Sequence, residues 1–379
     1  MTTFGPRFTV LFPLLLLLAA CSVSKPLPMD ASADTLGTDA LNITPEMQLT
    51  EVDILAVNDD MRAFLNEHVP KASSNQRKVE LILQAILEEG LSLDYNAFQT
   101  LTAEQAFYQR EGNCLSFTNL FVALAREVGL DAEYQEVDVP PSWDRLGNNH
   151  LFNRHINVRV RLPFEGEQAV DFNMTDFDVE YRRKRVSDEY ALALYHNNMA
   201  VYWLGEKQLE QAYLHARRAI ELKPEADFFW TNLGTVHRRS GDDVRAEAAW
   251  REAVRLGDEP SAISNLARLY ERQGRDELAR EYADVADSYR QKNPYYLYSI
   301  SEEAYDAGDY TTAISILKRA VRIRDNEHEF YRLMGLSHLQ LGNKDAALRN
   351  FQLAEDVAAS EEDRARYNQK QRLMAQIAN

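Results

Sequence analysis

Small residues recur at a near-constant interval through the second half of this 379-residue chain. Four glycines are separated by 33, 34 and 34 residues, namely Gly241, Gly274, Gly308 and Gly342. Two series of alanines keep the same interval: Ala212, Ala246, Ala279, Ala313 and Ala347, and Ala219, Ala253, Ala286, Ala320 and Ala354. A unit of this length cannot bury its apolar face alone, so neighbouring copies must stack against one another. The interval therefore predicts an extended solenoid.

The best-defined unit has a Trp-Thr-Asn-Leu-Gly run at 230–234, followed by Gly241, Ala246, Trp250 and Ala253. This pattern resembles the tetratricopeptide repeat, a pair of antiparallel helices. Small residues let the two helices approach closely, and a glycine permits the turn between them. The resemblance implies an all-α tetratricopeptide-repeat solenoid of five repeats.

The solenoid is expected over residues 191–359, with a polar capping helix over 360–379. One unit departs from the pattern, because Lys207 occupies the turn position where the others have glycine. Terminal helices of solenoids need one polar face, which the composition of the last segment supplies.

Solenoids of this kind bind peptides or partner proteins on their concave side. The repeat register directs eight side chains there: Leu194, Asn197, Phe228, Arg238, Arg268, Tyr298, Tyr305 and Arg332. For any one of them, an ordinary solvated helix position is the competing interpretation. The repeats predict a protein or peptide partner without identifying it.

The first residues of the sequence predict an export signal. Arg7 precedes an apolar run over 8–20, which contains a proline and is too short to span a bilayer. Its end, Leu-Ala-Ala-Cys at 18–21, resembles the lipobox of bacterial lipoproteins. The resemblance implies a signal peptide over 1–20, and lipidation of Cys21, for example with palmitate. Ser22 favours sorting to the periplasmic face of the outer membrane, whereas an ordinary secretory signal is the alternative.

Residues 21–44 are polar and are expected to form a flexible tether. The chain has 59 acidic and 42 basic residues and a net charge of −17, so its field repels phosphate backbones. No nucleic-acid partner is expected, and membrane attachment is expected through the lipid anchor only. The two cysteines, Cys21 and Cys114, provide no disulfide framework.

The segment over 45–190 begins with helical periodicity. An apolar stripe is expected to end at Gly90 and comprises Val79, Ile82, Leu83, Ile86 and Leu87. A capping box over 102–105 opens a second helix, which is expected to stop at Gly112. A third helix follows, with apolar residues spaced over 117–128 and an end at Gly129.

Cys114 lies at the first turn of that third helix. Backbone N–H groups and the helix dipole favour a thiolate at such a position. A buried structural cysteine is the alternative interpretation. The predicted export weighs against it, since an oxidising compartment threatens an unpaired thiol.

A loop is expected over 140–149, followed by a strand over 155–162. Alternation puts four apolar residues on one face of the strand, namely Ile156, Val158, Val160 and Leu162, and puts His155, Asn157 and Arg159 on the other. A turn over 163–168 leads to a second strand that carries Asp171. The order Cys, His, Asp is that of a thiol nucleophile, its base and the group that orients the base.

A family resemblance rests on three parts of this segment: the run Gly-Asn-Cys-Leu-Ser-Phe-Thr-Asn-Leu-Phe-Val-Ala-Leu-Ala-Arg-Glu-Val-Gly-Leu-Asp-Ala at 112–132, His155, and Val170–Asp171. Together they resemble the transglutaminase-like superfamily of papain-type thiol enzymes. The resemblance covers about 80–186. It implies an α+β papain/transglutaminase-like domain over 45–190, with Cys114 as nucleophile, His155 as general base and acid, and Asp171 holding the imidazole. Where the family often has a Trp two residues after its His, this chain has Asn157.

The sequence does not assign every group of the predicted site. The oxyanion donor would be the Cys114 N–H plus an unassigned group, for which Tyr108 and Gln109 are candidates. Asn113 and Asn157 are expected to support the site.

His150 competes with His155 as the base, although the strand register favours His155. Asp176 or Asp178 would replace Asp171 if the register slipped. Metal-binding pairs such as His-x-x-x-His or Cys-x-x-Cys and Gly-rich phosphate loops do not occur in the sequence, so no metal and no cofactor are expected.

The implied reaction is acyl transfer through a thioester. Water as acceptor makes the protein a cysteine peptidase or amidase, which is the preferred interpretation, and an amine as acceptor makes it a cross-linking enzyme. In the alternative, the protein is a non-catalytic, lipid-anchored scaffold that binds partners through its repeats.

Overall fold

The computed structural model describes residues 36–358, apart from 45, 90, 92, 147–148, 164–165, 173–181 and 258, and also Arg364 and Tyr367. The predicted signal peptide, Cys21, Asp176, Asp178 and nearly all of the predicted capping helix lie outside the described residues. Among the described residues, no helix is both long and apolar enough to cross a membrane.

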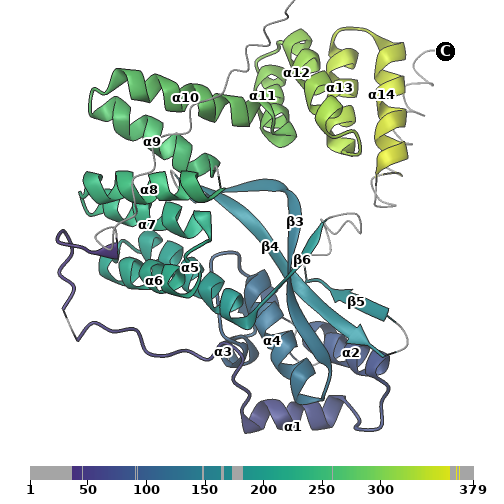
Figure 1. Ribbon diagram of the computed structural model, residues 1–379. Helices are drawn as coiled ribbons and strands as arrows, with labels where there is room; N and C mark the ends of the chain where they lie inside the picture. The colour runs from purple at the N-terminus through teal and green to yellow at the C-terminus, as the bar shows by residue number, and fades with distance from the viewer. Residues whose placement is uncertain are drawn as a thin grey trace, which may run out of the picture.

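The first domain combines helices with two small sheets (Figure 1). Its helices are α1 (Asp59–His68), α2 (Asn75–Gln84) with a π-helical turn (Ala85–Glu89), α3 (Ala103–Gln109) and α4 (Cys114–Glu127). The smaller sheet pairs β1 (Asp94–Tyr95) in parallel with β2 (Glu111–Gly112). The larger sheet has the order β5 (Gly166–Val170), β4 (Asn149–Leu162), β3 (Asp131–Leu146), β6 (Arg183–Val186). The predicted α+β class of this domain is confirmed.

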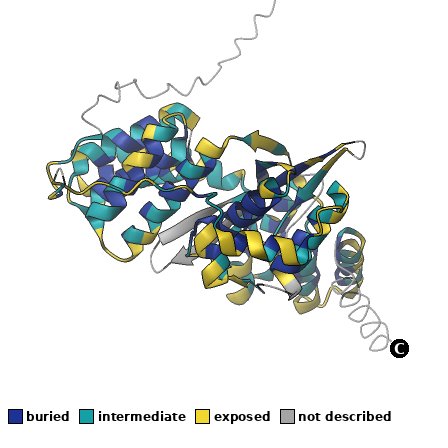
Figure 2. Ribbon diagram, turned by 90° about the horizontal axis from the view of Figure 1, so that it is seen from below, coloured by how far each residue is buried: buried dark blue, intermediate teal, exposed yellow. Residues whose placement is uncertain are grey.

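The helix α4 packs on one face of the larger sheet. All four apolar residues assigned to one face of the strand over 155–162 are buried, as expected. From β3, the buried Tyr134 donates a hydrogen bond to the Oδ1 atom of Asn119 on α4, at 2.7 Å. Figure 2 shows the buried residues gathered where helices face the sheet and one another. This packing fixes the start of α4 relative to β4.

The predicted loop over 140–149 is wrong. The strand β3 continues to Leu146 and β4 begins at Asn149, so the two form a long hairpin. The pairing shifts register between Val137 and Ser142, and the two prolines in this interval explain the shift because proline has no N–H to donate. The two prolines, which predicted a loop, therefore lie in a bulge within a strand.

Two other expected boundaries and the burial of one residue in this domain also differ. The helix α3 ends at Gln109 rather than Gly112, because Arg110 adopts a left-handed conformation with φ of 59° and caps it. The strand β5 begins at Gly166, which shortens the expected turn over 163–168. Leu87, which was expected in the apolar stripe, is 45% exposed because the helix widens into the π-helical turn.

Five antiparallel helix pairs follow, and they confirm the predicted repeat solenoid (Figure 1). They are α5 (Asp188–Gly205) with α6 (Leu209–Leu222), α7 (Asp227–Arg239) with α8 (Asp243–Gly257), α9 (Pro260–Arg272) with α10 (Asp276–Gln291), α11 (Pro294–Asp306) with α12 (Tyr310–Ile323), and α13 (His328–Gln340) with α14 (Lys344–Val357). Close packing within a pair needs its small residues: a Cβ atom at Gly234 would lie 2.6 Å from the Trp250 ring.

The turn within the first pair is strained. Lys207 has φ of 61°, in the left-handed region that glycine occupies at the four equivalent turns. A side chain costs roughly 1–2 kcal/mol in this conformation, and the greater freedom of glycine in the unfolded chain offsets part of the gain from removing it. Lys207→Gly is therefore expected to raise the free energy of unfolding by about 0.5–1 kcal/mol. Chemical denaturation checks this, with Lys207→Ala as the control that should bring no gain.

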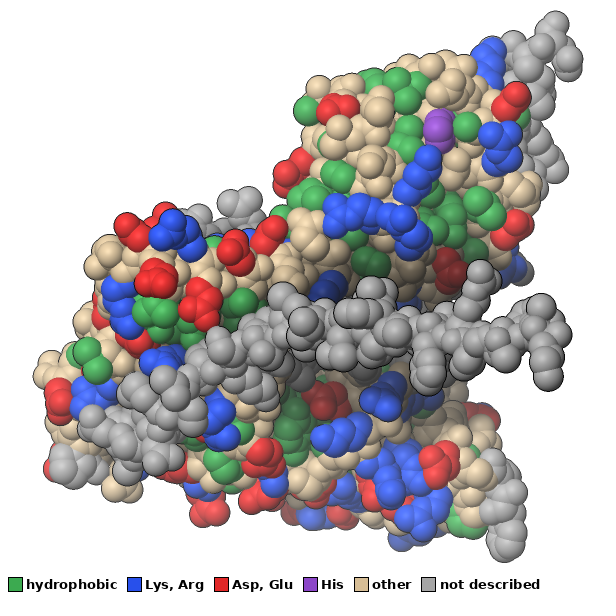
Figure 3. Space-filling model, turned by 45° about the horizontal axis from the view of Figure 1, so that its top comes forward, with side chains coloured by type: hydrophobic (Ala, Val, Ile, Leu, Met, Phe, Trp, Pro, Cys, Tyr) green, Lys and Arg blue, Asp and Glu red, His purple; other side chains and the backbone are tan. Residues whose placement is uncertain are grey.

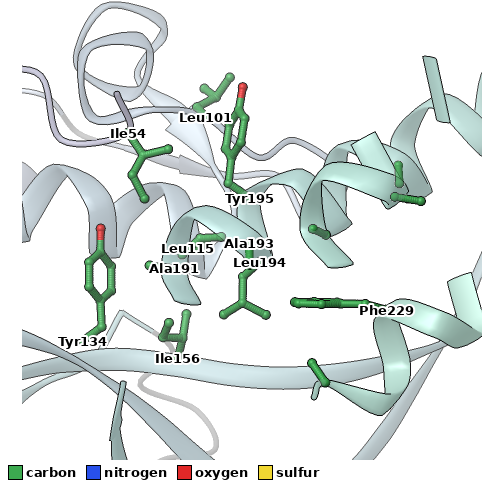
Figure 4. Packing of buried hydrophobic residues seen from close by; sticks show 14 of the residues in the cluster. Ile54, Leu101, Leu115, Tyr134, Ile156, Ala191, Ala193, Leu194, Tyr195 and Phe229 are labelled. Carbon is green, nitrogen blue, oxygen red and sulfur yellow. The ribbon is translucent and has the colours of Figure 1, made fainter. Parts of the chain in front are cut away.

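The solenoid and the first domain share one hydrophobic core. Figure 4 shows Leu194 of α5 lying between Ile156 of β4 and Phe229 of α7, with Leu115 of α4 close by. Leu194 was expected on the partner-binding side, yet it is only 8% exposed. The concave side of the first repeat is thus occupied by the protein's own first domain.

Polar contacts reinforce this junction. Arg126 of α4 makes a bidentate ion pair with Asp188 in the first turn of α5, with N–O distances of 2.6 and 2.9 Å. The Tyr190 hydroxyl donates to Glu136 of β3 at 3.1 Å.

The described part of the expected tether, residues 36–44, also differs from a free linker. Within it, Leu41 is buried and Asp39 pairs with Arg245 of α8 at 2.8 Å.

Two histidines are buried against each other between α5 and α6. The Nδ1 atoms of His196 and His215 lie 3.0 Å apart, and burial lowers the pKa of His196 to about 3 and that of His215 to about 4. As the pH falls below 6.5, both histidines become protonated in the unfolded chain but stay neutral in the folded protein. Between pH 7 and pH 5, the free energy of unfolding is expected to fall by about 2 kcal/mol for each histidine.

Denaturation curves at the two pH values check this expectation. The double variant His196→Gln, His215→Gln should lose most of the pH-dependent decrease. An equal decrease in the variant would show that other groups cause it.

Candidate active site

The segment before α4 determines where Cys114 sits. Asn113 caps the helix, since its Oδ1 atom accepts a hydrogen bond from the Ser116 N–H at 3.1 Å, and Cys114 is the first helical residue. The first N–H groups of a helix have no partner within it and point toward any group bound at its start. Gly112 has φ of 148°, and a Cβ atom there would lie 2.5 Å from the Ser116 side chain. A glycine is therefore required for this approach to the helix.

The hydroxyl of Ser116 ties the first turn of α4 to the chain before α3. It accepts a hydrogen bond from the Leu101 N–H at 2.8 Å and donates to the Gln99 carbonyl at 3.2 Å. These contacts hold the turn carrying Cys114 from two sides.

His155 and Asp171 meet at one edge of the larger sheet. The Nε2 atom of His155 lies 2.7 Å from Oδ2 of Asp171, and their side chains are 11% and 5% exposed. Asn157, two residues along β4, is fully buried and donates its Nδ2 to the same oxygen at 2.9 Å. The carboxylate is thus held by two donors from one strand.

Cys114 is the second partner of the imidazole. Burial by itself lowers the pKa of His155, but hydrogen bonds to Asp171 and Cys114 outweigh it and raise the pKa to about 9. With Nε2 directed at Asp171, Nδ1 is the ring nitrogen left to face the thiol. The structure therefore brings together the three residues that the sequence order suggested, as a cysteine, a histidine and an aspartate in series.

A fourth side chain, which sequence reasoning missed, lies beside the thiol. The hydroxyl oxygen of Tyr95 is 3.8 Å from Sγ of Cys114. Tyr95 belongs to the two-residue strand β1, which pairs with β2 directly before α4. A strand this short leaves no periodic pattern in the sequence, so no signal pointed to it.

Comparison with protein families decides the nature of this domain. A family model, the transglutaminase-like superfamily, matches residues 62–166. This part of the chain is a transglutaminase-like domain. The matched segment contains Cys114 and His155 and ends before Asp171.

Several solved structures are similar to this chain at low identity. YrrB, described as a TPR protein with an unusual peptide-binding site, is 17% identical over 47% of this chain and 92% of its own, with a TM-score of 0.25. The pilF protein of Pseudomonas aeruginosa is 15% identical over 49% of this chain and 88% of its own, with a TM-score of 0.27. The Cut9–Hcn1 hetero-tetramer of the APC/C is 19% identical over 49% of this chain and 36% of its own, with a TM-score of 0.27. A search of curated proteins finds no match.

The other supporting residues of the transglutaminase-like domain have different partners from those expected. The Tyr108 hydroxyl donates to Asp60 of α1 at 2.7 Å, and both residues line a separate surface cavity of about 430 Å³ that does not include Cys114. Gln109 accepts from the Gln99 amide at 2.8 Å. The Asn113 side chain is used as the helix cap. The oxyanion role suggested for Tyr108 is therefore not supported by its position.

The competing base, His150, lies within β4 opposite Arg145 rather than in a loop. It is His155 that contacts both Asp171 and Cys114. Among the described residues, no group of three or more potential metal ligands occurs.

The residues expected in the groove divide into two sets. Asn197 is buried and accepts from the Asn232 amide at 2.7 Å, so it belongs to the interior. The remaining groove positions are partly or fully exposed, namely Phe228, Arg238, Arg268, Tyr298, Tyr305 and Arg332. Among them, Arg238 pairs with Asp243 at 3.3 Å, and Arg332 donates to the Tyr298 hydroxyl at 3.0 Å. Any partner surface thus begins at the second repeat.

Proposed function

We propose that the transglutaminase-like domain is a thiol-dependent acyl-transfer enzyme that acts chiefly as a cysteine peptidase or amidase. The proposal rests on the 2.7 Å distance between Nε2 of His155 and Asp171, and on a thiol, that of Cys114, close enough to the ring to raise the pKa of His155. A nucleophile, its base and the group that orients the base are the minimum set for covalent catalysis of this kind.

In the proposed reaction, the Sγ atom of Cys114 attacks the carbonyl carbon of an amide as a thiolate, with its proton held by His155. The carbon–nitrogen bond then breaks, and His155 gives the proton to the leaving amine. A thioester remains on Cys114. Water adds to the thioester carbonyl with His155 as the base, the carbon–sulfur bond breaks, and the acid product leaves. Asp171 stays ionised and holds the imidazolium throughout.

The raised pKa of His155 supports this assignment. A ring with a pKa of about 9 carries its proton at pH 7, as an imidazolium beside a thiolate requires. An amine in place of water would give cross-linking by the same first half-reaction. Acceptor selection depends on how far water is excluded from the thioester.

The first experiment is alkylation of the mature protein by iodoacetamide across pH 4 to 9. Cys114 is the one thiol of a chain that starts after Cys21. An unperturbed thiol titrates near 8.5 and reacts slowly at pH 6. Fast alkylation at pH 6 is expected, and it should collapse in His155→Ala.

The control is His150→Ala, which should alkylate like the wild type. Slow alkylation at pH 6 that is indifferent to His155 would refute the proposed pair. It would favour the second function, a lipid-anchored scaffold in which the domain binds peptide without reacting. The size of the solenoid is the observation that favours this alternative.

We also propose that the protein is held at the periplasmic face of a bacterial outer membrane by lipid on Cys21. The Leu-Ala-Ala-Cys sequence supports this, as does Ser22. Cys21→Ser should move the protein from the membrane fraction to the soluble fraction. Unchanged fractionation would contradict anchoring through this residue.

The repeats are proposed to recruit a protein substrate or partner to the thiol. In support, the first repeat shares its hydrophobic core with the transglutaminase-like domain, which keeps the following repeats attached close to it. Figure 3 shows acidic and basic side chains interspersed over one face of the molecule. The expectation that nucleic acid is not a partner stays a prediction.

A further inference from the structure

We infer that Tyr95 is the side-chain donor of the oxyanion site, so that its hydroxyl and the Cys114 N–H together bind the oxygen of the acyl group. The inference deepens the proposed function and rests on it. It replaces the residues suggested from the sequence, since the Tyr108 hydroxyl is bonded to Asp60.

Backbone pairing holds Tyr95 beside the start of α4. Tyr95 is paired with Gly112, two residues before Cys114. On either side of it, the Asp94 N–H donates to the Arg110 carbonyl and the Asn96 N–H donates to the Gly112 carbonyl, each at 2.9 Å. The tyrosine is therefore tied to the segment that positions the nucleophile, although it lies 19 residues away in the sequence.

The ring is placed so that its hydroxyl, rather than its face, meets the thiol. It makes an edge contact with Phe117 on α4, with ring centroids 6.4 Å apart. The residue is 61% exposed, so a substrate can approach the hydroxyl from solvent. The hydroxyl oxygen lies 3.8 Å from Sγ of Cys114.

In the resting site the Cys114 thiol donates to the Tyr95 oxygen over this distance, an interaction that ends when the thiol loses its proton. When Sγ adds to a carbonyl carbon, the electron pair of the C=O bond moves to the oxygen, which is then two bonds from Sγ. A donor beside the sulfur, but longer than an ordinary hydrogen bond from it, is within reach of that oxygen. Tyr95 would donate its hydrogen to the negative oxygen without transferring it, so no proton needs to be replaced.

The Cys114 N–H is the natural second donor. It lies at the first position of α4, where helix N–H groups have no partner within the helix, and the helix dipole favours negative charge there. Two donors converging on one developing charge form the usual oxyanion arrangement in acyl transfer.

Two reactions of the same thiol test the inference. Acylation by p-nitrophenyl acetate passes through an oxyanion, whereas alkylation by iodoacetamide does not. In Tyr95→Phe, acylation measured by p-nitrophenolate release is expected to slow about 10²–10³-fold. Alkylation at pH 6 should change by less than about twofold, because the thiolate and His155 are untouched.

The matched control is Tyr202→Phe, which removes the hydroxyl of a 39% exposed tyrosine on α5 and should change neither rate. Tyr108→Phe tests the alternative donor, and a selective loss of acylation there instead would overturn the inference. So would unchanged acylation in Tyr95→Phe. Equal loss of both reactions would show that Tyr95 acts on the thiol itself, and faster acylation would show that it obstructs the site.

These outcomes are distinct from failure of the proposed function. That failure appears in the wild-type protein, as slow alkylation at pH 6 that does not depend on His155. The inference about Tyr95 fails when the wild type is reactive and Tyr95→Phe does not selectively slow acylation, or when Tyr108→Phe does so instead.

Discussion

Asp171→Asn is expected to slow acyl transfer about 10⁴-fold while the protein stays folded. The carboxylate accepts from Nε2 of His155 at 2.7 Å, which keeps a proton on Nε2 and leaves Nδ1 for the thiol. An asparagine can turn its NH₂ group toward Nε2 instead. The neutral ring would then carry its proton on Nδ1 and could not accept one from Cys114.

The pH dependence should change in a defined direction. Burial lowers the pKa of His155, and its bonds to Asp171 and Cys114 raise it to about 9. In the wild type, acylation of Cys114 by p-nitrophenyl acetate is expected to decline above about pH 9, where the imidazolium loses its proton. In Asp171→Asn this decline should move to lower pH. The pKa of His155 falls there because burial still lowers it, while the bond to the Asp171 carboxylate no longer raises it.

Stability adds a second measurement. The folded pKa of His155 is raised above its unfolded value of 6.5, so the pair with Asp171 stabilises the fold fully below pH 6.5 and loses its effect as the pH rises through about 9. The stability deficit of Asp171→Asn should therefore shrink at high pH. Asp276→Asn on α10 serves as the control for loss of a carboxylate. A near-wild-type acylation rate in Asp171→Asn would contradict the assigned role.

Leu194→Ala is expected to lower the free energy of unfolding by about 2–5 kcal/mol, the range for a buried leucine replaced by alanine. The same substitution should reduce the reactivity of Cys114. Leu194 lies between Ile156 and Phe229, and Ile156 directly follows His155 in β4 (Figure 4). A cavity there loosens the strand that holds the base.

Two probes of one sample check this prediction. Tryptophan fluorescence follows mainly the repeats, which contain three of the four tryptophans, Trp203, Trp230 and Trp250, and alkylation of Cys114 follows the first domain. Both should change together in Leu194→Ala. Leu353→Ala, at a 43% exposed position on α14, should cost less than about 0.5 kcal/mol and leave alkylation unchanged. Normal Cys114 reactivity in a destabilised Leu194→Ala protein would show that the two parts behave independently.

Most of the architecture could be predicted because it depends on local regularities. The interval between Gly241 and Gly342 predicts helix pairs, and alternation around Val158 predicts the strand that carries His155. The proximity of Cys114, His155 and Asp171 could be suggested for the same reason, since each follows from the position of a residue within one element.

The parts that could not be predicted depend on contacts between distant segments. Tyr95 reaches the thiol through a pairing of only two residues, which has no period. Leu194 has the register of a groove residue, and nothing local distinguishes a groove filled by another domain from an open one. Pro140 and Pro141 have the composition of a loop, although the surrounding strands accommodate them in a bulge.

The packing of the first repeat on the thiol-bearing domain would also limit which amide bonds reach Cys114 in the proposed reaction. With α5 fixed against β4, each later repeat lies at a set distance from Cys114. A polypeptide seated farther along the array has to bridge that distance before one of its amides meets the nucleophile. Under the proposed function, the length of chain between the docked segment and the cleaved bond would therefore decide which substrates react.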